Sequence, residues 1–150
     1  MKFIKDYEHE QRITELIESS NKVIICSGWL YNSGLKLLVP SMIKNMENKD
    51  NSIIIYSSKE HSQIRDLNKL TKYSNFTSKI IKNKNGKVHT KLYYFEFKNY
   101  FIAIIGSANI TKGGLSNNKE LSLEMEDLID SDNYIYIQNY IKSLAKLEES

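Results

Sequence analysis

The chain has little of several residue types that mark special classes of protein. Its 150 residues include one cysteine, Cys26, so no disulfide can form within it. It has one proline, six glycines, and no apolar run approaching membrane-spanning length. Its first residues, MKFIKDYEHEQR, lack the apolar stretch of a secretory signal peptide. We therefore expect a protein of the reducing cytoplasm, in which Cys26 is a small buried residue.

The length and composition fit one ordinary globular domain. Hydrophobic residues make up 41% of the chain and charged residues 26%, which is typical of a folded domain. No internal repeat, low-complexity tract or linker interrupts the sequence. We expect a single domain over residues 1–150.

Hydrophobic periodicity predicts alternating helices and strands, followed by a region rich in strands. Helices are expected over 11–19, 33–50, 61–73 and 130–149, and strands over 22–30, 51–58, 76–83, 87–97, 99–109 and 122–126. Pro40 is expected to interrupt or kink the second helix, and Ser131 or Asp132 to cap the last. Asn85-Gly86 predicts a hairpin between 76–83 and 87–97. The expected fold is α/β, a mixed β-sheet sandwiched between helices.

Positive charge is concentrated in the middle of the chain. Residues 61–112 contain ten Lys/Arg and two Asp/Glu, against a net charge of +3 for the whole sequence. The lysines at the centre of this region are Lys79, Lys82, Lys84, Lys87 and Lys91. Alone, such a cluster is equally typical of a solvated hairpin. Beside a chemical site it indicates a track for a polyanion such as a nucleic acid.

A histidine and a lysine stand two residues apart in VHTKLYYFEF, where a strand is expected. On a strand, His89 and Lys91 would point the same way and could reach one small anion. Burying an ammonium without a partner is costly, and a phosphate is a natural partner. The pair alone is weak evidence, because chance often produces His-x-Lys.

The next expected strand ends in Gly-Ser-Ala-Asn, with two more polar side chains spaced by two. Ser107 and Asn109 can donate hydrogen bonds to phosphate oxygens. Further along, Glu120 in NNKE can accept a hydrogen bond from an imidazole and fix its tautomer. Each feature alone is also explained by a turn or a surface residue. The ordered set is more specific.

The ordered set HTK, GSAN and NNKE resembles the signature of the phospholipase D superfamily. The residues of and around these motifs are most similar to the bacterial nuclease and restriction-endonuclease branch. The resemblance carried by these motifs covers residues 88–121 and implies a phospholipase D-like fold. Glu96 stands where the signature has Asp. By strand parity it faces away from His89 and Lys91, so we expect it to have a structural role.

The resemblance also implies a mechanism, a double displacement at phosphorus through a covalent phosphohistidine. His89 is then the nucleophile, Lys91 and Asn109 hold the non-bridging oxygens, Ser107 adds a hydrogen bond, and Glu120 orients the imidazole. A second histidine must protonate the leaving oxygen, yet the motif occurs once. The other histidines, His9 and His61, lack a matching lysine and are expected at the surface, although His61 follows an expected strand and can be near the substrate. We therefore expect a homodimer in which two copies of His89 share one site.

No metal or other cofactor is expected, and cleavage should survive EDTA. The favoured function is a metal-independent endonuclease acting on DNA, with Lys79, Lys82, Lys84 and Lys87 binding the nucleic acid. Aromatic residues nearby (Tyr73, Phe76 and Tyr93) can stack on bases if exposed, although they are more typical of a core. The alternatives are a phospholipid hydrolase or transferase of the same superfamily, for which no membrane anchor is visible, and a non-catalytic nucleic-acid-binding module. The choice of DNA or RNA, the strandedness and the source of any sequence specificity stay open.

Overall fold

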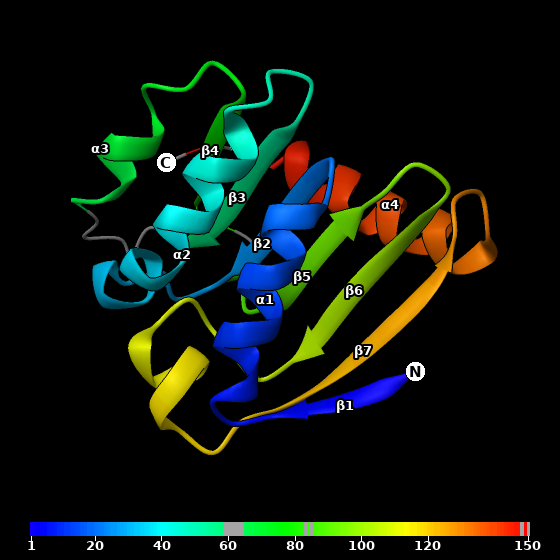
Figure 1. Ribbon diagram of the computed structural model, residues 1–150, viewed down its shortest axis with the longest axis horizontal. Coiled ribbons are helices and arrows are strands. Elements are labelled where there is room, and N and C mark those ends of the chain that lie inside the picture. The colour runs from blue at the N-terminus through cyan, green and yellow to red at the C-terminus, as the bar shows by residue number, and fades with distance from the viewer. Residues whose placement is uncertain (59–64, 83, 85, 148, 150) are drawn as a thin grey trace.

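A computed structural model of the chain shows a seven-stranded mixed sheet between helices, as expected. It describes residues 1–58, 65–82, 84, 86–147 and 149. The strands lie in the order β1-β7-β6-β5-β2-β3-β4 (Figure 1). Their bounds are β1 Lys2–Lys5, β2 Lys22–Ser27, β3 Ser52–Ser58, β4 Phe76–Ile81, β5 Lys91–Glu96, β6 Tyr100–Gly106 and β7 Leu121–Leu128. The strands β2, β3 and β4 are parallel, and the remaining neighbours are antiparallel.

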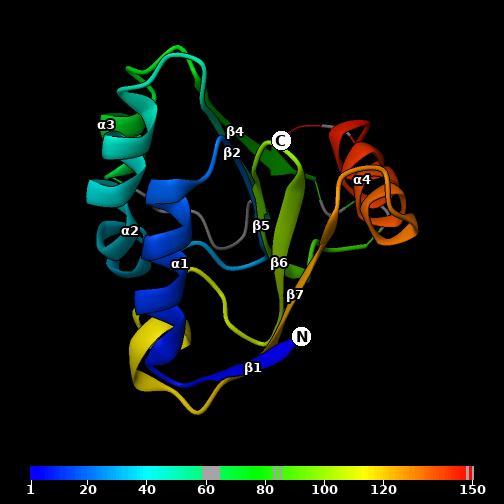
Figure 2. The ribbon, with the colours of Figure 1, turned by 45° about the vertical axis from the view of Figure 1, so that its right-hand side comes forward.

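Helices cover both faces of this sheet. On one face lie α1 (Glu8–Ser19) and α2 (Asn32–Met46), and on the other lies α4 (Asp132–Ala145) (Figure 2). The short α3 (Leu67–Leu70) contributes Leu70 to the core beneath α2, and the π-helical turn η2 (Gly113–Asn117) contributes Leu115 to the same core. The sheet therefore separates two hydrophobic cores, one under α1 and α2 and a smaller one under α4.

Two predicted details of the helices and strands are confirmed, and a third is wrong in part. Ser131 caps α4, because its Oγ accepts a hydrogen bond from the backbone N–H of Tyr134 at 3.1 Å. Cys26 is fully buried in β2, and burial raises the pKa of its thiol to about 12. The expected interruption at Pro40 is wrong in part, since α2 continues through this residue to Met46.

The predicted hairpin between β4 and β5 is also wrong. The strand β4 lies at the edge of the sheet beside β3, whereas β5 lies between β2 and β6. The four residues from Leu92 to Phe95 are all buried, so this strand needs a covered position inside the sheet. Ile81, at the end of β4, and Lys91, at the start of β5, are consequently separated by the ends of β3 and β2. Asn85, on which the hairpin prediction depended, lies outside the described residues.

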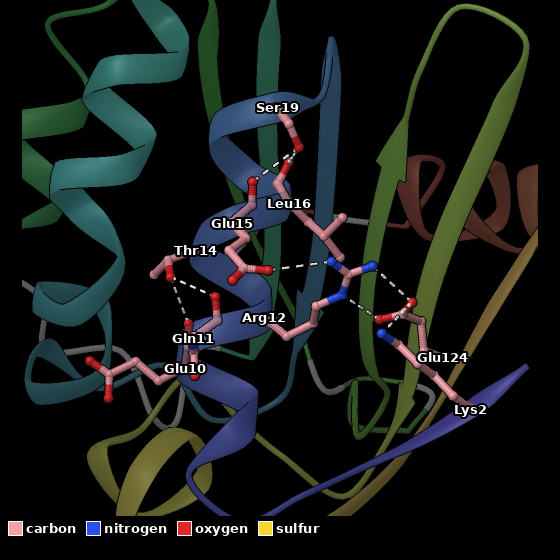
Figure 3. Close-up of polar contacts among 9 residues, drawn as sticks. All are labelled: Lys2, Glu10, Gln11, Arg12, Thr14, Glu15, Leu16, Ser19 and Glu124. Atoms are coloured by element: carbon pink, nitrogen blue, oxygen red, sulfur yellow. Dashed lines mark hydrogen bonds and ion pairs between the residues drawn. The ribbon is translucent and has the colours of Figure 1, made fainter.

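An ion pair fastens α1 to the β1–β7 edge of the sheet. The Arg12 guanidinium binds both carboxylate oxygens of Glu124, with Nε–Oε1 at 2.7 Å and Nη2–Oε2 at 3.0 Å (Figure 3). Lys2 Nζ lies 3.7 Å from the same carboxylate. Glu124 is 6% exposed, so its charge depends on these partners for compensation. The hydrogen bond with Glu124 raises the pKa of Arg12. The contact holds β7 in place, and β7 begins directly after Glu120.

Candidate active site

The pairing of the strands places the C-terminal ends of β2 and β6 and the N-terminal ends of β5 and β7 at the same end of the sheet. Ser27, the last residue of β2, pairs with Lys91, the first residue of β5. In the same way Gly106, at the end of β6, pairs with Ser122 near the start of β7. The segments that follow or precede these ends carry His89, Ser107, Asn109 and Glu120. Motifs that are up to 31 residues apart in sequence therefore meet at this end of the sheet.

His89 and Lys91 lie against each other at the start of β5. Lys91 Nζ is 2.9 Å from His89 Nδ1 and donates to the His89 carbonyl at 2.8 Å. His89 is exposed and lies just before the strand, which begins at Lys91. Partial burial lowers the pKa of Lys91, and the nearby negative charge of Glu120 opposes that shift. The site thus holds an ammonium with few partners beside an imidazole, a pairing that a phosphate would complete.

Asn109 is held so that its amide N–H groups remain for a ligand. Its Oδ1 accepts a hydrogen bond from the backbone N–H of Trp29 at 3.3 Å. Ser27 Oγ, which donates to the Trp29 carbonyl at 2.5 Å, lies 3.3 Å from the same Oδ1. The buried Ser27 hydroxyl also accepts from the backbone N–H of Ile110 at 2.9 Å. Because the oxygen is bound from behind, the Nδ2 end is the part of the side chain that can serve the cavity.

Glu120 contacts the polar residues around it, and its described hydrogen bonds do not include His89. Ser107 Oγ donates to Glu120 Oε1 at 2.5 Å, and Asn118 Nδ2 donates to Oε2 at 3.3 Å. The backbone N–H of Leu121 donates to Ser107 Oγ at 3.1 Å, which fixes the hydroxyl between the two segments. The structure therefore places Glu120 at the site, and its predicted action on the imidazole stays a prediction.

Two hydrogen bonds with Asp6 hold the backbone of Glu120 in place. The Asp6 N–H donates to the Glu120 carbonyl at 3.0 Å, and the Glu120 N–H donates to Asp6 Oδ1 at 3.1 Å. The second of these bonds is the main cause that lowers the pKa of Asp6. His9 links Asp6 to β7, with Nδ1 2.8 Å from the Asp6 carbonyl oxygen and Nε2 2.8 Å from Ser122 Oγ. Since that carbonyl can only accept, Nδ1 carries the proton.

His9 was expected at the surface, and this prediction is wrong. Its ring is fully buried, because α1 begins at Glu8 and turns this residue toward β7. It lines neither the cavity described below nor its rim. The other candidate, His61, lies outside the described residues.

A cavity of about 530 Å³ opens at the end of the sheet where β2 and β6 stop, and all five predicted catalytic residues line it. These residues are His89, Lys91, Ser107, Asn109 and Glu120. We call it the His89 cavity. Its other walls were not anticipated from the sequence, and they come from the segment after β2 and the segment around η2 (Trp29, Tyr31, Ser33, Thr111, Lys112, Gly113, Gly114 and Asn118). Only their place in the sequence could have indicated these walls, because both segments directly follow apolar strands that end in polar residues.

Close backbone approach at Gly28 positions the histidine. A Cβ atom at this glycine would lie 2.4 Å from the Val88 carbonyl oxygen and 3.3 Å from His89 Cα. Only a residue without a side chain lets the segment before β5 lie so close to the end of β2. The identity of residue 28 therefore helps to determine where His89 stands.

The lysines predicted to bind nucleic acid lie away from the cavity lining. Lys79 Nζ donates to the carbonyl of Ala145 at 2.7 Å, near the end of α4. Lys82, Lys84 and Lys87 are exposed in the connection that leads to His89. They can contact a long substrate beyond the cavity, and their role stays a prediction.

The aromatic residues proposed to stack on bases lie mostly in the core. Tyr93 is fully buried and donates to the Ala108 carbonyl at 2.9 Å, and Phe76 is buried beneath α2. Tyr73 packs partly against the same core. Glu96 behaves as predicted, since its Oε1 accepts a hydrogen bond from Tyr94 at 2.6 Å on the α4 side of the sheet. Burial, together with this bond, raises the pKa of Tyr94.

Comparison with models of known protein families assigns the chain to one family. Residues 8–148 match the family described as the NgoFVII restriction endonuclease N-terminal PLD domain, where PLD denotes phospholipase D. The chain belongs to this family. The match covers nearly the whole chain and includes all the residues that line the His89 cavity. A comparison with curated protein sequences finds no match.

Solved structures share the fold at low sequence identity. NucT from Helicobacter pylori superimposes with a TM-score of 0.71 at 19% identity, covering 97% of this chain and 98% of that one. Nuc from Salmonella typhimurium, a phospholipase D family member, gives 0.69 at 12% identity, with 97% and 93% covered. Yeast tyrosyl-DNA phosphodiesterase 1 gives 0.62 at 14% identity, and the PLD domain spans 38% of its chain. These similarities confirm the predicted phospholipase D-like fold.

Two further properties concern the described part of the chain. Among those residues, no group of three or more His, Cys, Asp or Glu side chains is placed to hold a metal ion. None of the helices formed by them is long and apolar enough to cross a membrane.

Proposed function

We propose that this PLD domain is a metal-independent endonuclease that hydrolyses DNA phosphodiester bonds through a phosphohistidine, in a site shared by two copies of the chain. The observation that supports it is the convergence of His89, Lys91, Ser107, Asn109 and Glu120 around one cavity. An imidazole, an ammonium, an amide, a hydroxyl and a carboxylate together supply a nucleophile and the donors that a phosphoryl group needs.

In the first step a ring nitrogen of His89 attacks phosphorus. A nitrogen–phosphorus bond forms as the bond from phosphorus to the leaving oxygen breaks, and a second imidazole gives that oxygen a proton. In the second step the same imidazole takes a proton from water, and the water oxygen displaces His89. Both products leave as a phosphate monoester and an alcohol, with no change in oxidation state.

The second imidazole comes from another copy of the chain. His9 is buried with both ring nitrogens hydrogen-bonded, so it cannot reach a substrate. A two-fold axis beside the exposed His89 would bring a second His89 to the same phosphate. In that arrangement each protomer supplies one His89, one Lys91 and one Asn109.

The remaining residues stabilise charge and position the rings. Lys91 turns from His89 Nδ1 to the phosphate when substrate binds, and Asn109 donates from Nδ2 to a non-bridging oxygen. Ser107 adds a hydroxyl at the rim. Once Lys91 has moved, Glu120 is the carboxylate at this site that can accept a hydrogen bond from an imidazole, which leaves the other ring nitrogen free to attack.

The decisive experiment combines a chelator with a histidine variant. Wild-type protein and His89→Ala are incubated in EDTA with plasmid, single-stranded DNA and phospholipid vesicles. We expect wild type to cleave DNA in EDTA and His89→Ala to be inactive. Loss of cleavage in EDTA that magnesium restores would refute the mechanism. Hydrolysis of phospholipid in place of DNA, or DNA binding by wild type without cleavage, would support the alternative functions instead.

A further inference from the structure

Two exposed aromatic side chains stand at the mouth of the His89 cavity. Trp29 is 40% exposed and Tyr31 is 38% exposed, and both line the cavity. Their ring centroids lie 5.6 Å apart with the planes tilted by 55°. The two rings are therefore tilted against each other and are not stacked flat.

The backbone that carries this aromatic pair is firmly held. The Trp29 N–H donates to Asn109 Oδ1 at 3.3 Å, and the Tyr31 N–H donates to the Ile110 carbonyl at 3.0 Å. Between them, Leu30 is fully buried and forms an isolated β-bridge with Ile110. The backbone of both aromatic residues is thus fixed relative to Asn109, a residue of the proposed phosphate site. A prepositioned ring costs less to order on binding than a mobile one.

A groove of about 480 Å³ adjoins the cavity on the same side. It shares Ser33 and Lys112 with the His89 cavity, and Lys36 and Arg65 add two more cations. We call it the Lys36 groove. None of the described residues that line it is a carboxylate. The nearest acid in sequence, Asp66, is mostly buried and bound by Lys69 at 3.1 Å.

We propose that Trp29 and Tyr31 form a base-stacking platform and that Lys36, Arg65 and Lys112 bind backbone phosphates, so that the site takes an unpaired stretch of nucleic acid. This inference rests on the proposed function and names its substrate class. Bases inside a duplex are already stacked on both faces, so an aromatic side chain can stack only on a base that is unpaired or turned out of the helix. The combination of exposed aromatic rings with neighbouring cations is typical of single-strand binding surfaces.

The single tryptophan of the chain makes this proposal directly measurable. Trp29 fluorescence is followed in the inactive His89→Ala background, titrated with a short single-stranded oligothymidylate and with a duplex of the same length. We expect the single strand to quench the emission and to bind at least about tenfold more tightly than the duplex. Equal binding, or binding without quenching, would overturn the proposal.

Variants separate stacking from charge, with affinity measured by anisotropy of a labelled oligothymidylate. Trp29→Ala should weaken binding about 5- to 150-fold, the range for the loss of one base–aromatic stack, while Trp29→Phe should keep most of the affinity. Lys36→Ala and Arg65→Ala should each lower the slope of log Kd against log salt by about 0.7. Lys98→Ala, at the opposite end of β5, is the control and should leave the slope unchanged. Unaltered affinity in Trp29→Ala, or unaltered slopes in both cation variants, would contradict the proposal.

Failure of this inference is distinguishable from failure of the proposed function, because no cleavage is needed to measure binding. Cleavage in EDTA by wild type, together with indifference to Trp29→Ala, would refute the platform and leave the nuclease intact. Quenching by single strands in a wild-type protein that cleaves nothing would refute the nuclease and support the platform.

Discussion

Replacing Gly28 by alanine tests whether the end of β2 sets the position of His89. The added Cβ would lie 2.4 Å from the Val88 carbonyl oxygen, against at least 3.4 Å for ordinary van der Waals contact. The obstacle is backbone, which cannot rotate away as a side chain could. The segment carrying His89 must therefore shift by about 1 Å, or β2 must shift by as much.

The expected magnitudes follow from that displacement. A misplacement of about 1 Å at a catalytic group can cost roughly 100-fold in rate. Overpacking of this kind typically destabilises a protein by about 1–3 kcal/mol. We therefore expect kcat of Gly28→Ala to fall about 100-fold while most of the protein remains folded.

The assay is cleavage of a fluorescent single-stranded oligonucleotide, together with urea unfolding of the same preparations. Ile53→Val is the matched control, because Ile53 is fully buried at the start of β3, the end remote from His89, and its loss of one methyl should cost about 0.5–1.5 kcal/mol. The control should lose stability and keep its kcat. A Gly28→Ala protein with wild-type kcat would refute the proposed link between Gly28 and His89.

Two further predictions concern the ion pair and the lysine. Arg12→Ala should lower the free energy of unfolding by about 3–5 kcal/mol in urea titrations, because it leaves the buried Glu124 carboxylate poorly compensated, and adding Glu124→Leu should restore much of the loss. No recovery in the double variant would contradict this explanation. Because burial lowers the pKa of Lys91, kcat/KM should decline with rising pH earlier than an ordinary lysine would cause, as the ammonium loses its proton. Lys91→Arg, which keeps its charge, should lack that alkaline decline even at a lower overall rate; the same decline in this variant would assign it to another group.

The residues of the candidate site were predictable because HTK, GSAN and NNKE follow one another in the order of the phospholipase D signature, and each motif stands beside an apolar strand. His89, Lys91, Ser107, Asn109 and Glu120 were all anticipated, and the structure places all five around one cavity. Strand ends are visible in a sequence as a change from apolar to polar residues. The aromatic and cationic walls, such as Trp29 and Lys112, were not anticipated, because single exposed residues in loops carry no periodic pattern.

Errors arose where tertiary packing overrode a local pattern. The Asn-Gly turn predicted a hairpin, yet the burial of β5 on both faces puts β2 and β3 between it and β4. His9 was expected at the surface because it lacks the lysine context of the motif. Its burial depends on Ser122, a partner 113 residues away. The four-residue strand β1 was missed, since such a short segment gives no recognisable period.

Mixing of subunits tests the composite site most directly. Wild type and His89→Ala are unfolded together in equal amounts, refolded, and assayed for cleavage, after sedimentation has shown that both form dimers. If each site needs His89 from both protomers, only wild-type dimers cleave, and activity should fall to about one quarter of that of the same total amount of wild type. Activity of about one half would show that each chain cleaves alone and would contradict the shared site.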